Sequence, residues 1–381
     1  MKLFKESCRT YFALSILTIF LYGSHANSSD IRIDALGGES RFLDDTVNLF
    51  RYPASAVNLP HIEIALFDDW AGAAYPLSEK HAIGLFFNRP TSRTHELRKY
   101  AIETGSEHFT QLDPKPWIDA LYARRLGNVN FGISGQHYRD ISNGAGYRAN
   151  ISASDITFGL GLHNKRNARI EVGFGLHRTN LEDSVAGRSI RQTTEGTGWH
   201  TDIRATLPLS NSFNLFPIIS TTSDAFALEP ETRKVSNWVA GVGLNSRPNQ
   251  KVLAVVGVLI AKNKTKSFSP DSGENKILEW SLPILSAGAE VQVGSILFRL
   301  GIRNQNLITE TTTPSTDSPE DRRYMDVLFN ANLGLGLEFG NVQIDGHLEQ
   351  DFLRDGPHII GGSRHGGGIF SAVSMTYQIR N

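Results

Sequence analysis

The feature that most constrains the fold of this chain is a period-two alternation of apolar and polar residues that continues almost to the C-terminus. It is clearest over residues 155–163 and 169–177, and it is longest over 325–339. A period of two places neighbouring side chains on opposite faces of a β-strand. Many long strands with one apolar face and one polar face are typical of a transmembrane β-barrel, which is apolar outside and hydrated inside.

The turns and loops between these strands predict the number of strands. Six tight connections contain the Gly, Asn and Pro residues that short hairpin turns need; they lie at residues 127–128, 164–167, 210–212, 247–249, 294 and 340–341. Longer polar connections alternate with them, near residues 89–116, 141–152, 182–197, 227–236, 266–276, 309–323 and 355–368. Thirteen connections predict an all-β, antiparallel barrel of fourteen strands between His81 and Arg380. Short turns are periplasmic in outer-membrane barrels, so both ends of the wall are expected there.

Sixteen strands are the alternative, because residues 61–67 also read as a strand and a further strand would then be needed upstream of them. We favour fourteen, with 61–67 inside the barrel or at its periplasmic mouth. Two irregularities are expected in the wall: residues 252–261 are apolar on both faces, and a phase slip over 283–285 predicts a β-bulge. A soluble β-sandwich or β-helix is the competing fold, and it would need shorter strands around a dry core.

The first 26 residues predict export. Lys2, Lys5 and Arg9 precede an apolar stretch over 10–22, and small residues lead to Ala26. This is the pattern of a cleaved signal peptide. The single cysteine, Cys8, lies within it, so no disulfide is expected in the exported chain. The remaining charges are mixed in sign along the sequence, which argues against a nucleic-acid partner. We expect residues 27–80 to form an N-terminal hatch and residues 81–381 to form the barrel.

Residues 27–80 break the alternation and carry a recognisable order of motifs. Residues 32–38 read Arg-Ile-Asp-Ala-Leu-Gly-Gly, and a paired aspartate, an asparagine and a Pro-Ala step follow. This order resembles the start of FadL-type outer-membrane proteins and their PorV-like relatives, with Tyr52 in place of the usual asparagine before Pro-Ala. The resemblance implies a hatch folded into the lumen and a role in transport or in the envelope. Its motif residues here are Gly37, Gly38, Asp44, Asp45, Asn48 and Pro53.

Facing the apolar phase outward turns a set of ionisable residues toward the lumen. These candidates are Asp155, Arg169, Glu171, His177, His200, Asp202, Arg204, Arg299, Arg303, Asp326, Glu338, Asp345, His347 and Glu349. Their signs are mixed, so no simple ion selectivity follows. They line a hydrated path, clamp the hatch, or pair across strands to stiffen the wall. Inward apolar residues such as Leu253, Val255, Leu297 and Leu328 are expected to pack against the hatch or to line a track for a hydrophobic substrate.

Motifs for an enzyme are weak. The sequence contains neither a His-Glu-x-x-His metal motif nor a Gly-x-Ser-x-Gly nucleophile elbow. We therefore expect no catalytic activity, no metal and no cofactor. The leading hypothesis is a bacterial outer-membrane channel for small compounds, with hydrophobic compounds as candidates, that diffuse past the hatch. A non-conducting scaffold for secreted or surface proteins is the alternative, with an envelope protein as partner, and an outer-membrane hydrolase is the least supported reading. In each case, outer-membrane lipid surrounds the barrel.

Overall fold

The computed structural model describes residues 30–65, 70–89, 116–144, 147–164, 167–185, 191–192, 196–228, 231–269, 273–313, 320–348 and 370–379. The predicted signal peptide and Glu349 lie outside these residues. Within them, no helix is both long enough and apolar enough to cross a membrane.

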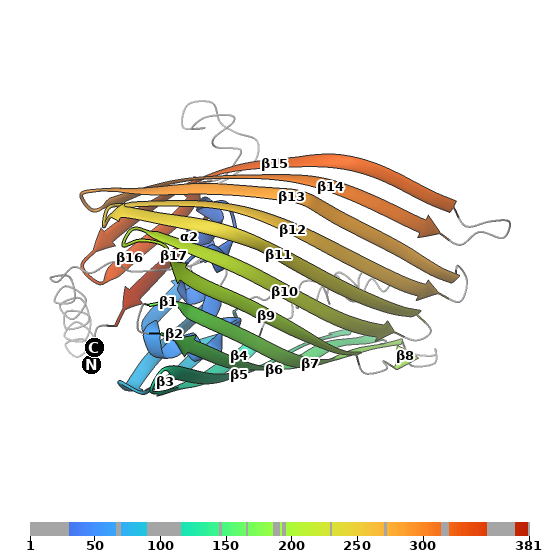
Figure 1. Ribbon diagram of the computed structural model, residues 1–381. Helices are drawn as coiled ribbons and strands as arrows, with labels where there is room; N and C mark the ends of the chain where they lie inside the picture. Colours follow the sequence, from blue (N-terminus) through green and yellow to red (C-terminus); the bar gives the residue numbers. More distant parts are fainter. Residues whose placement is uncertain are drawn as a thin grey trace, which may run out of the picture.

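The wall is a closed antiparallel barrel (Figure 1). The sheet has 17 strands, of which β8 is a two-residue piece that pairs with β7 alone, so 16 strands form the wall. Closure occurs at β1, because its residues pair with β2 on one side and with β17, the last strand, on the other. No edge is left unpaired between the first and last strands, which is the condition for a sheet that must satisfy its backbone groups in lipid.

The strands of the wall differ greatly in length. The bounds are β1 His61–Ala65, β2 Trp70–Ser78, β3 His81–Phe87, β4 Pro116–Leu126, β5 Val129–Gly144, β6 Tyr147–His163, β7 Arg169–Val185, β8 Arg191–Gln192, β9 Gly196–Pro208, β10 Phe213–Leu228, β11 Glu231–Asn249, β12 Val252–Ser269, β13 Gly273–Val293, β14 Ile296–Thr313, β15 Glu320–Phe339, β16 Val342–Leu348 and β17 Phe370–Gln378. Strands of about ten residues suffice to cross a bilayer. The longest, β13 with 21 residues, therefore continues well beyond the apolar layer.

The preferred count of fourteen strands is wrong, and the alternative of sixteen is correct. Residues 61–65 belong to the wall rather than to the interior, and the remaining strand is β2, which lies downstream of them rather than upstream. The wall thus begins at His61 and not at His81. The sequence of β2 explains the error: Trp70, Gly72 and Ala74 face inward, so neither of its faces is polar.

The tight turns lie where the sequence places them, except that the one expected at 247–249 lies at residues 250–251, because 247–249 belong to β11. Several of the predicted long connections are in part strand, whereas most of 89–116 and all of 355–368 lie outside the described residues. Gly127, Gly294 and Gly340 occupy turns with positive φ, which glycine adopts without steric cost. Residues near 227–236 and 266–276 remain paired within β10 to β13. The bulge expected over 283–285 is present. Between Ser281 and Ile284, β13 has one more residue than the facing part of β12 and one more than the facing part of β14.

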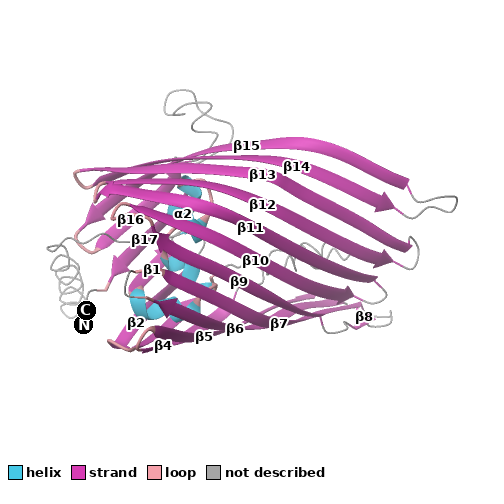
Figure 2. Cartoon of the chain, in the orientation of Figure 1, coloured by secondary structure: helices cyan, strands magenta, loops and turns pink. Residues whose placement is uncertain are grey.

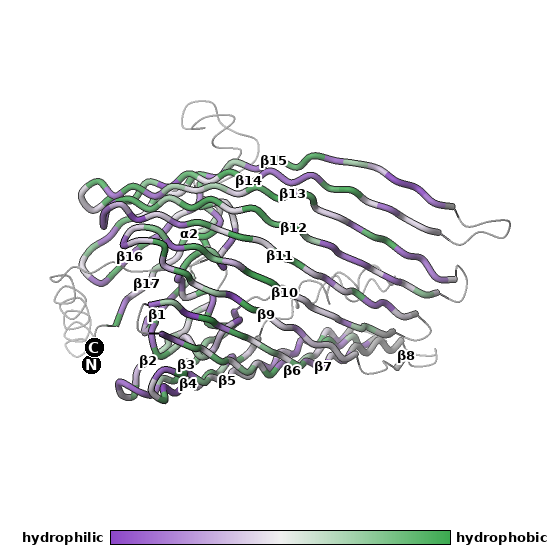
Figure 3. Tube along the Cα trace, viewed as in Figure 1, coloured by the Kyte–Doolittle hydropathy of each residue, from purple (hydrophilic) through white to green (hydrophobic). Residues whose placement is uncertain are grey.

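The outer face of the wall is apolar, as the alternation predicts. Side chains such as Phe158, Phe174, Val256 and Leu300 are exposed there, at 41 to 54% of their full accessible area. Figure 3 shows hydrophobic residues alternating with hydrophilic ones along the strands. Exposed apolar side chains on a closed barrel are suited to lipid. We call the end that carries the short turns the turn end, and the opposite end the open end.

Residues 30–58 fold inside the barrel, in its turn-end half (Figure 2). We call them the luminal segment. It contains α2 (Asp30–Ala35) and three short 3-10 helices, η1 (Ser40–Phe42), η2 (Thr46–Phe50) and η3 (Pro53–Asn58). Helical turns satisfy the backbone polar groups of a chain that has no strand to pair with.

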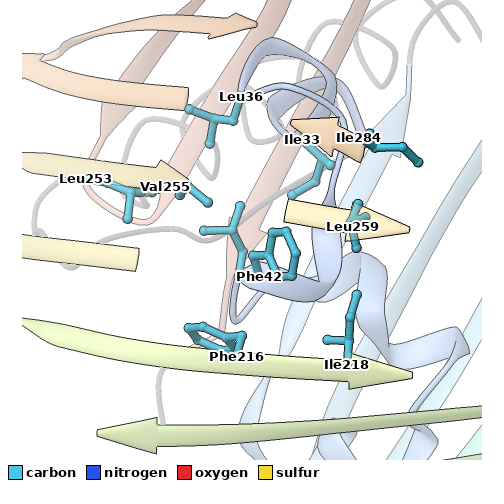
Figure 4. Packing of buried hydrophobic residues seen from close by; sticks show 10 residues of the cluster. Ile33, Leu36, Phe42, Phe216, Ile218, Leu253, Val255, Leu259 and Ile284 are labelled. Atoms are coloured by element: carbon cyan, nitrogen blue, oxygen red, sulfur yellow. The ribbon is translucent and has the colours of Figure 1, made fainter. Parts of the chain in front are cut away.

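The buried core lies between this segment and the wall. Phe42 is fully buried, and it packs against Leu253, Val255 and Leu259 of β12 (Figure 4). The inward apolar residues of β12 therefore pack against the luminal segment, which is one of the two roles expected for them; the other was to line a track for a hydrophobic substrate. A second cluster joins Leu49 and Ala56 of the segment to Phe86 and its neighbours on β2 to β4. Leu328, by contrast, is 42% exposed.

Candidate functional site: the luminal segment and the vestibule beneath it

The wall makes room for the luminal segment through inward-facing glycines. A Cβ atom on Gly173 would collide with the carbonyl oxygen of Arg51, and one on Gly243 or Gly257 would collide with the ring of Phe42. The same holds at Gly288 against the backbone of Leu36. Because these glycines come from β7, β11, β12 and β13, the segment touches the wall on several sides. The positions of these glycines in the strands therefore match the shape of the luminal segment.

The hatch motif residues shape the segment itself. Gly37 and Gly38 have φ of 95° and 78°, and they turn the chain after α2 in a backbone conformation that residues with a side chain rarely adopt. The carboxylate of Asp45 accepts from the backbone of Val47 and caps η2. Asn48 donates to the carbonyl oxygens of residues 40 and 43, at 2.9 and 3.0 Å. Pro53 stands at the start of η3, where its missing N–H costs nothing.

One buried group of charges holds the middle of the segment; we call it the Glu171 cluster. Arg204 and Glu171 form an ion pair between β9 and β7, and both side chains are almost fully buried. Arg204 also donates to the backbone carbonyl of Leu43 at 2.6 Å. On the segment side, the hydroxyl of Ser55 donates to Glu171, and Asp44 pairs with Arg169. Two carboxylates thus balance two guanidinium groups.

A second group, the Glu290 cluster, holds α2. The guanidinium of Arg32 binds Asp45 at 2.8 Å and Glu290 of β13 at 2.9 Å. Glu290 also accepts from Arg299 at 2.6 Å, and Arg299 pairs in turn with Asp345 at 2.6 Å. Three carboxylates therefore face two guanidinium groups in a buried site. Removing one partner of such a group leaves an uncompensated charge away from water, which costs about 3–5 kcal/mol.

The acidic groups of the segment respond differently to this environment. Burial raises the pKa of Asp45 above its ordinary value, and the opposing effect of Arg32 does not cancel it. Burial acts in the same direction on Glu39, but hydrogen bonds and charge from Arg41 outweigh it and lower the pKa. Burial also raises the pKa of Tyr52, whose ring lies 5.0 Å from the guanidinium of Arg204. Tyr52 therefore packs where the family pattern has an amide.

A polar cavity of about 890 Å³ lies beneath the segment at the turn end. We call it the vestibule. Asp44 and Arg169 border it, together with His163 and the turn residues Asn164 and Asn167. Asp44 is 44% exposed, so the ion pair that closes the Glu171 cluster is also the one that water reaches. On the opposite side of the segment, inward-phase residues such as Asn237 and Asn330 are exposed near the open end.

The predicted lumen residues fall into three groups. Six take part in the ion pairs around the luminal segment: Arg169, Glu171, Asp202, Arg204, Arg299 and Asp345. Others pair along the wall: Asp155 with Gln136, His177 with Asp224, His200 with Thr157, and Glu338 with Gln292. Arg303 lies beside Gly38, His347 is half-buried, and Asp326 is exposed.

Sequence reasoning missed two residues that join the segment to the wall. Glu290 bridges Arg32 and Arg299, and its signal was present, because residues 287–293 alternate small or apolar residues with Gly288, Glu290 and Gln292. The phase slip just before this stretch obscured it. Arg51 pairs with Asp202 at 3.2 Å, and nothing in the pattern of residues 27–60 singles it out. Among the described residues, no group of three or more His, Cys, Asp or Glu side chains is placed to hold a metal ion.

Comparison with known proteins gives a likeness of fold. No protein-family model and no curated protein matches the sequence. Among solved structures, the toluene transporter TodX of Pseudomonas putida is 9% identical, over 94% of this chain and 99% of that one, with a TM-score of 0.40. The alcaligin outer-membrane receptor FauA of Bordetella pertussis is 9% identical, over 76% of this chain and 59% of that one, with a TM-score of 0.42.

The siderophore receptor PiuA of Acinetobacter baumannii is 8% identical, over 76% of this chain and 48% of that one, with a TM-score of 0.42. The chain thus spans about half to three fifths of the length of these two receptors. The resemblance of the luminal segment to the FadL-type N-terminus stays a prediction.

Proposed function

We propose that the protein is a bacterial outer-membrane channel through which small compounds diffuse past the luminal segment. The observation that carries this proposal is the arrangement of three zones along one lumen. Exposed polar side chains line the open end, the luminal segment fills the turn-end half, and the vestibule lies beneath it. Short turns mark the periplasmic end of such barrels. A compound would enter from outside and leave through the vestibule.

Movement of the segment is the step that would admit a compound. The Asp44–Arg169 pair is the candidate latch, since it borders the vestibule and Asp44 is partly exposed. Exposed or half-exposed ion pairs contribute little, about 0–1 kcal/mol. The buried Glu290 cluster is much harder to release, so α2 and Asp45 would stay docked while residues 46–58 shift. The cargo would then pass along the side of the lumen formed by β6, β7 and β9.

Uptake into liposomes tests the proposal. The purified full-length protein is reconstituted, and the entry of small polar probes and of an aromatic hydrocarbon is followed. We expect slow uptake by the wild type and at least tenfold faster uptake by D44N, because the partly exposed Asp44–Arg169 pair is lost while the Arg204–Glu171 pair and the Glu290 cluster remain. The matched control is D326N, which removes an exposed carboxylate remote from the segment. Absence of uptake by folded wild type and by D44N alike would remove the channel from consideration.

A non-conducting scaffold is the second candidate, and one observation favours it. Two buried charge clusters and a fitted set of glycines hold the luminal segment, which is more anchoring than a freely moving gate needs. Purification from native membranes under mild conditions discriminates between the two. A stoichiometric envelope protein together with no uptake supports the scaffold, whereas uptake by the isolated chain contradicts it.

A further inference from the structure

The outer face of the wall carries a row of lysines near the open end. Lys234 of β11, Lys266 of β12 and Lys276 of β13 are direct cross-strand partners. Residues directly opposite each other on one face have Cβ atoms about 4.5–5.5 Å apart, and like charges at that spacing are destabilising. Lys264 and Lys262 continue the group down β12. Five positive charges therefore crowd three neighbouring strands.

The register shows that this group faces outward. The pairing of β11 with β12 runs without interruption from Ala254 to Phe268. Val256, Val258 and Ile260 are exposed on the lipid face, so the even-numbered lysines of β12 share that face. Asn263 points the other way and donates to Glu279 of β13 at 2.9 Å. In Figure 3, hydrophilic residues become more frequent toward the open end of β12 and β13.

Two tryptophans mark the depth of the group. Lys262 lies between Trp238 and Trp280, its partners on β11 and β13, and its ammonium lies 4.4 Å from the centre of the Trp280 ring. Tryptophan collects where apolar core meets headgroups in membrane barrels. The continuous apolar run of β12 ends at Ala261, and the lysines begin at this aromatic level, with Phe268 as the one further apolar residue of the strand. The charges are thus placed at the height of lipid headgroups.

The protein itself supplies little opposite charge. Lys266 pairs with Glu274 at 2.7 Å, and both side chains are well exposed. Glu274 also attracts Lys264 and Lys276, but among the described residues neither they nor Lys234 form an ion pair with it or with another carboxylate. Glu310 of β14, the nearest further acid on this face, lies beside Arg323 at 3.6 Å. The group keeps a strong positive charge that an external anion would offset.

We propose that Lys234, Lys262, Lys264, Lys266 and Lys276 bind the phosphate groups of an anionic glycolipid in the outer leaflet. The lysines bind the phosphates, while Trp238, Trp280 and the apolar belt below them contact the acyl chains. This site is independent of whether the lumen conducts. A lipid is the partner because the charge lies directly above a lipid-exposed apolar surface, which a free anion would not use.

Native mass spectrometry of the detergent-solubilised protein tests this site. The probes are bisphosphorylated lipid A, the same lipid without phosphates, and inorganic pyrophosphate. The variant K264Q/K276Q removes two lysines that have no ion-pair partner. The matched control K80Q/K251Q removes two exposed lysines from turn-end hairpins. Each basic residue near an anionic lipid surface contributes about 1 kcal/mol, so two should weaken binding roughly 30-fold.

The expected result is loss of the phosphorylated lipid from K264Q/K276Q, full binding by K80Q/K251Q, and weak binding of the dephosphorylated lipid by all proteins. Equal binding of phosphorylated lipid by the wild type and K264Q/K276Q would overturn the proposal. So would equal affinity for lipid with and without phosphate. Pyrophosphate binding as tight as that of the lipid would assign the site to a free anion instead. Both variants should keep the heat-modifiable gel mobility of a folded barrel.

Discussion

Single inward glycines of the wall have a clear function once the luminal segment is in place. In the sequence they are merely small residues on the polar face of the strands. In the structure, Gly173 is the point where β7 meets the carbonyl of Arg51, and Gly161 on β6 is a glycine with space around it. A Cβ on Gly161 would find its nearest neighbours at 3.5 Å, an ordinary contact. Comparing the two positions therefore shows whether a glycine is needed because the luminal segment leaves no room for a Cβ atom, as at Gly173, or whether alanine would fit, as at Gly161.

We expect G173A to weaken docking of the luminal segment and G161A to leave it unchanged. Overpacking a tight contact costs about 1–3 kcal/mol. Limited proteolysis of the folded protein measures the effect, because cleavage within residues 30–58 requires the segment to leave the wall. The cleavage rate should rise several-fold in G173A. Equal rates for the two variants would show that the segment is not held against β7 as the structure has it.

The raised pKa of Asp45 gives a pH dependence with a definite sign. A carboxyl whose pKa is higher when docked takes up a proton more readily in that state. Its contribution favours docking at low pH and is lost as the pH rises through the docked pKa, above the ordinary value of about 3.9. The variant D45N keeps a side chain that caps η2 and removes this titration. Relative to D45N, the wild type should become more susceptible to proteolysis as the pH rises above about 4.

The comparison between the two proteins isolates Asp45, since Glu39 titrates in both. The lowered pKa of Glu39 acts in the opposite sense, because its ion pair with Arg41 is lost as the pH falls. Superimposable pH profiles for wild type and D45N would show that Asp45 does not titrate in the docked state.

The strands show which parts of the fold can be predicted from sequence. Alternation and turn residues locate the strands from β3 onward because lipid on one side and water on the other impose opposite polarities. That contrast is missing in β2, where Trp70, Gly72 and Ala74 face the luminal segment instead of water. The sequence of β2 therefore shows no alternation between apolar and polar residues that would reveal a strand. Pairing also continues beyond the apolar layer, where residues such as Ser267 and Asn275 read as loop.

The candidate site was partly predictable for the same reason. The alternation gives the inward direction of Glu171, Arg204 and Arg299, but not their depth along the strand. Depth decides whether a charge meets the luminal segment or water, and it depends on strand tilt and register, which the sequence pattern does not contain. Asp326 and Asp345 share the inward phase, yet one is exposed and the other fully buried.

Closure by β1 leads to a prediction about assembly. Ile64 is one of the five residues of β1 that pair with both β2 and β17. Proline there removes a ladder hydrogen bond, and it is therefore excluded from strands that are paired on both sides. We expect I64P to lose the heat-modifiable gel shift of a closed barrel. The control E79P places proline in the β2–β3 turn, where it is tolerated; a normal shift for I64P would show that β1 does not close the wall.

On the scale of the whole molecule, function depends on whether the luminal segment moves as a unit or stays fixed. Arg32 and the Glu290 cluster anchor one end, whereas the part beside the vestibule is held by Asp44 and the ion pairs of Glu171. The barrel is rigid by comparison, because each strand has two paired neighbours. Any route between the open end and the vestibule therefore has to pass along residues 43–58.

A disulfide between the segment and the wall decides this question. The Cβ of Ala54 lies 3.9 Å from the Cβ position at Gly161, close to the mean of about 3.8 Å found in disulfides. In a C8S background, the variant A54C/G161C should therefore crosslink η3 to β6 on oxidation. If compounds pass the moving segment, uptake should fall at least tenfold in the oxidised protein and return on adding a reductant. Uptake by the single variants A54C and G161C should not change between oxidising and reducing conditions. If uptake by A54C/G161C is equally fast with the crosslink in place, the segment does not gate the lumen.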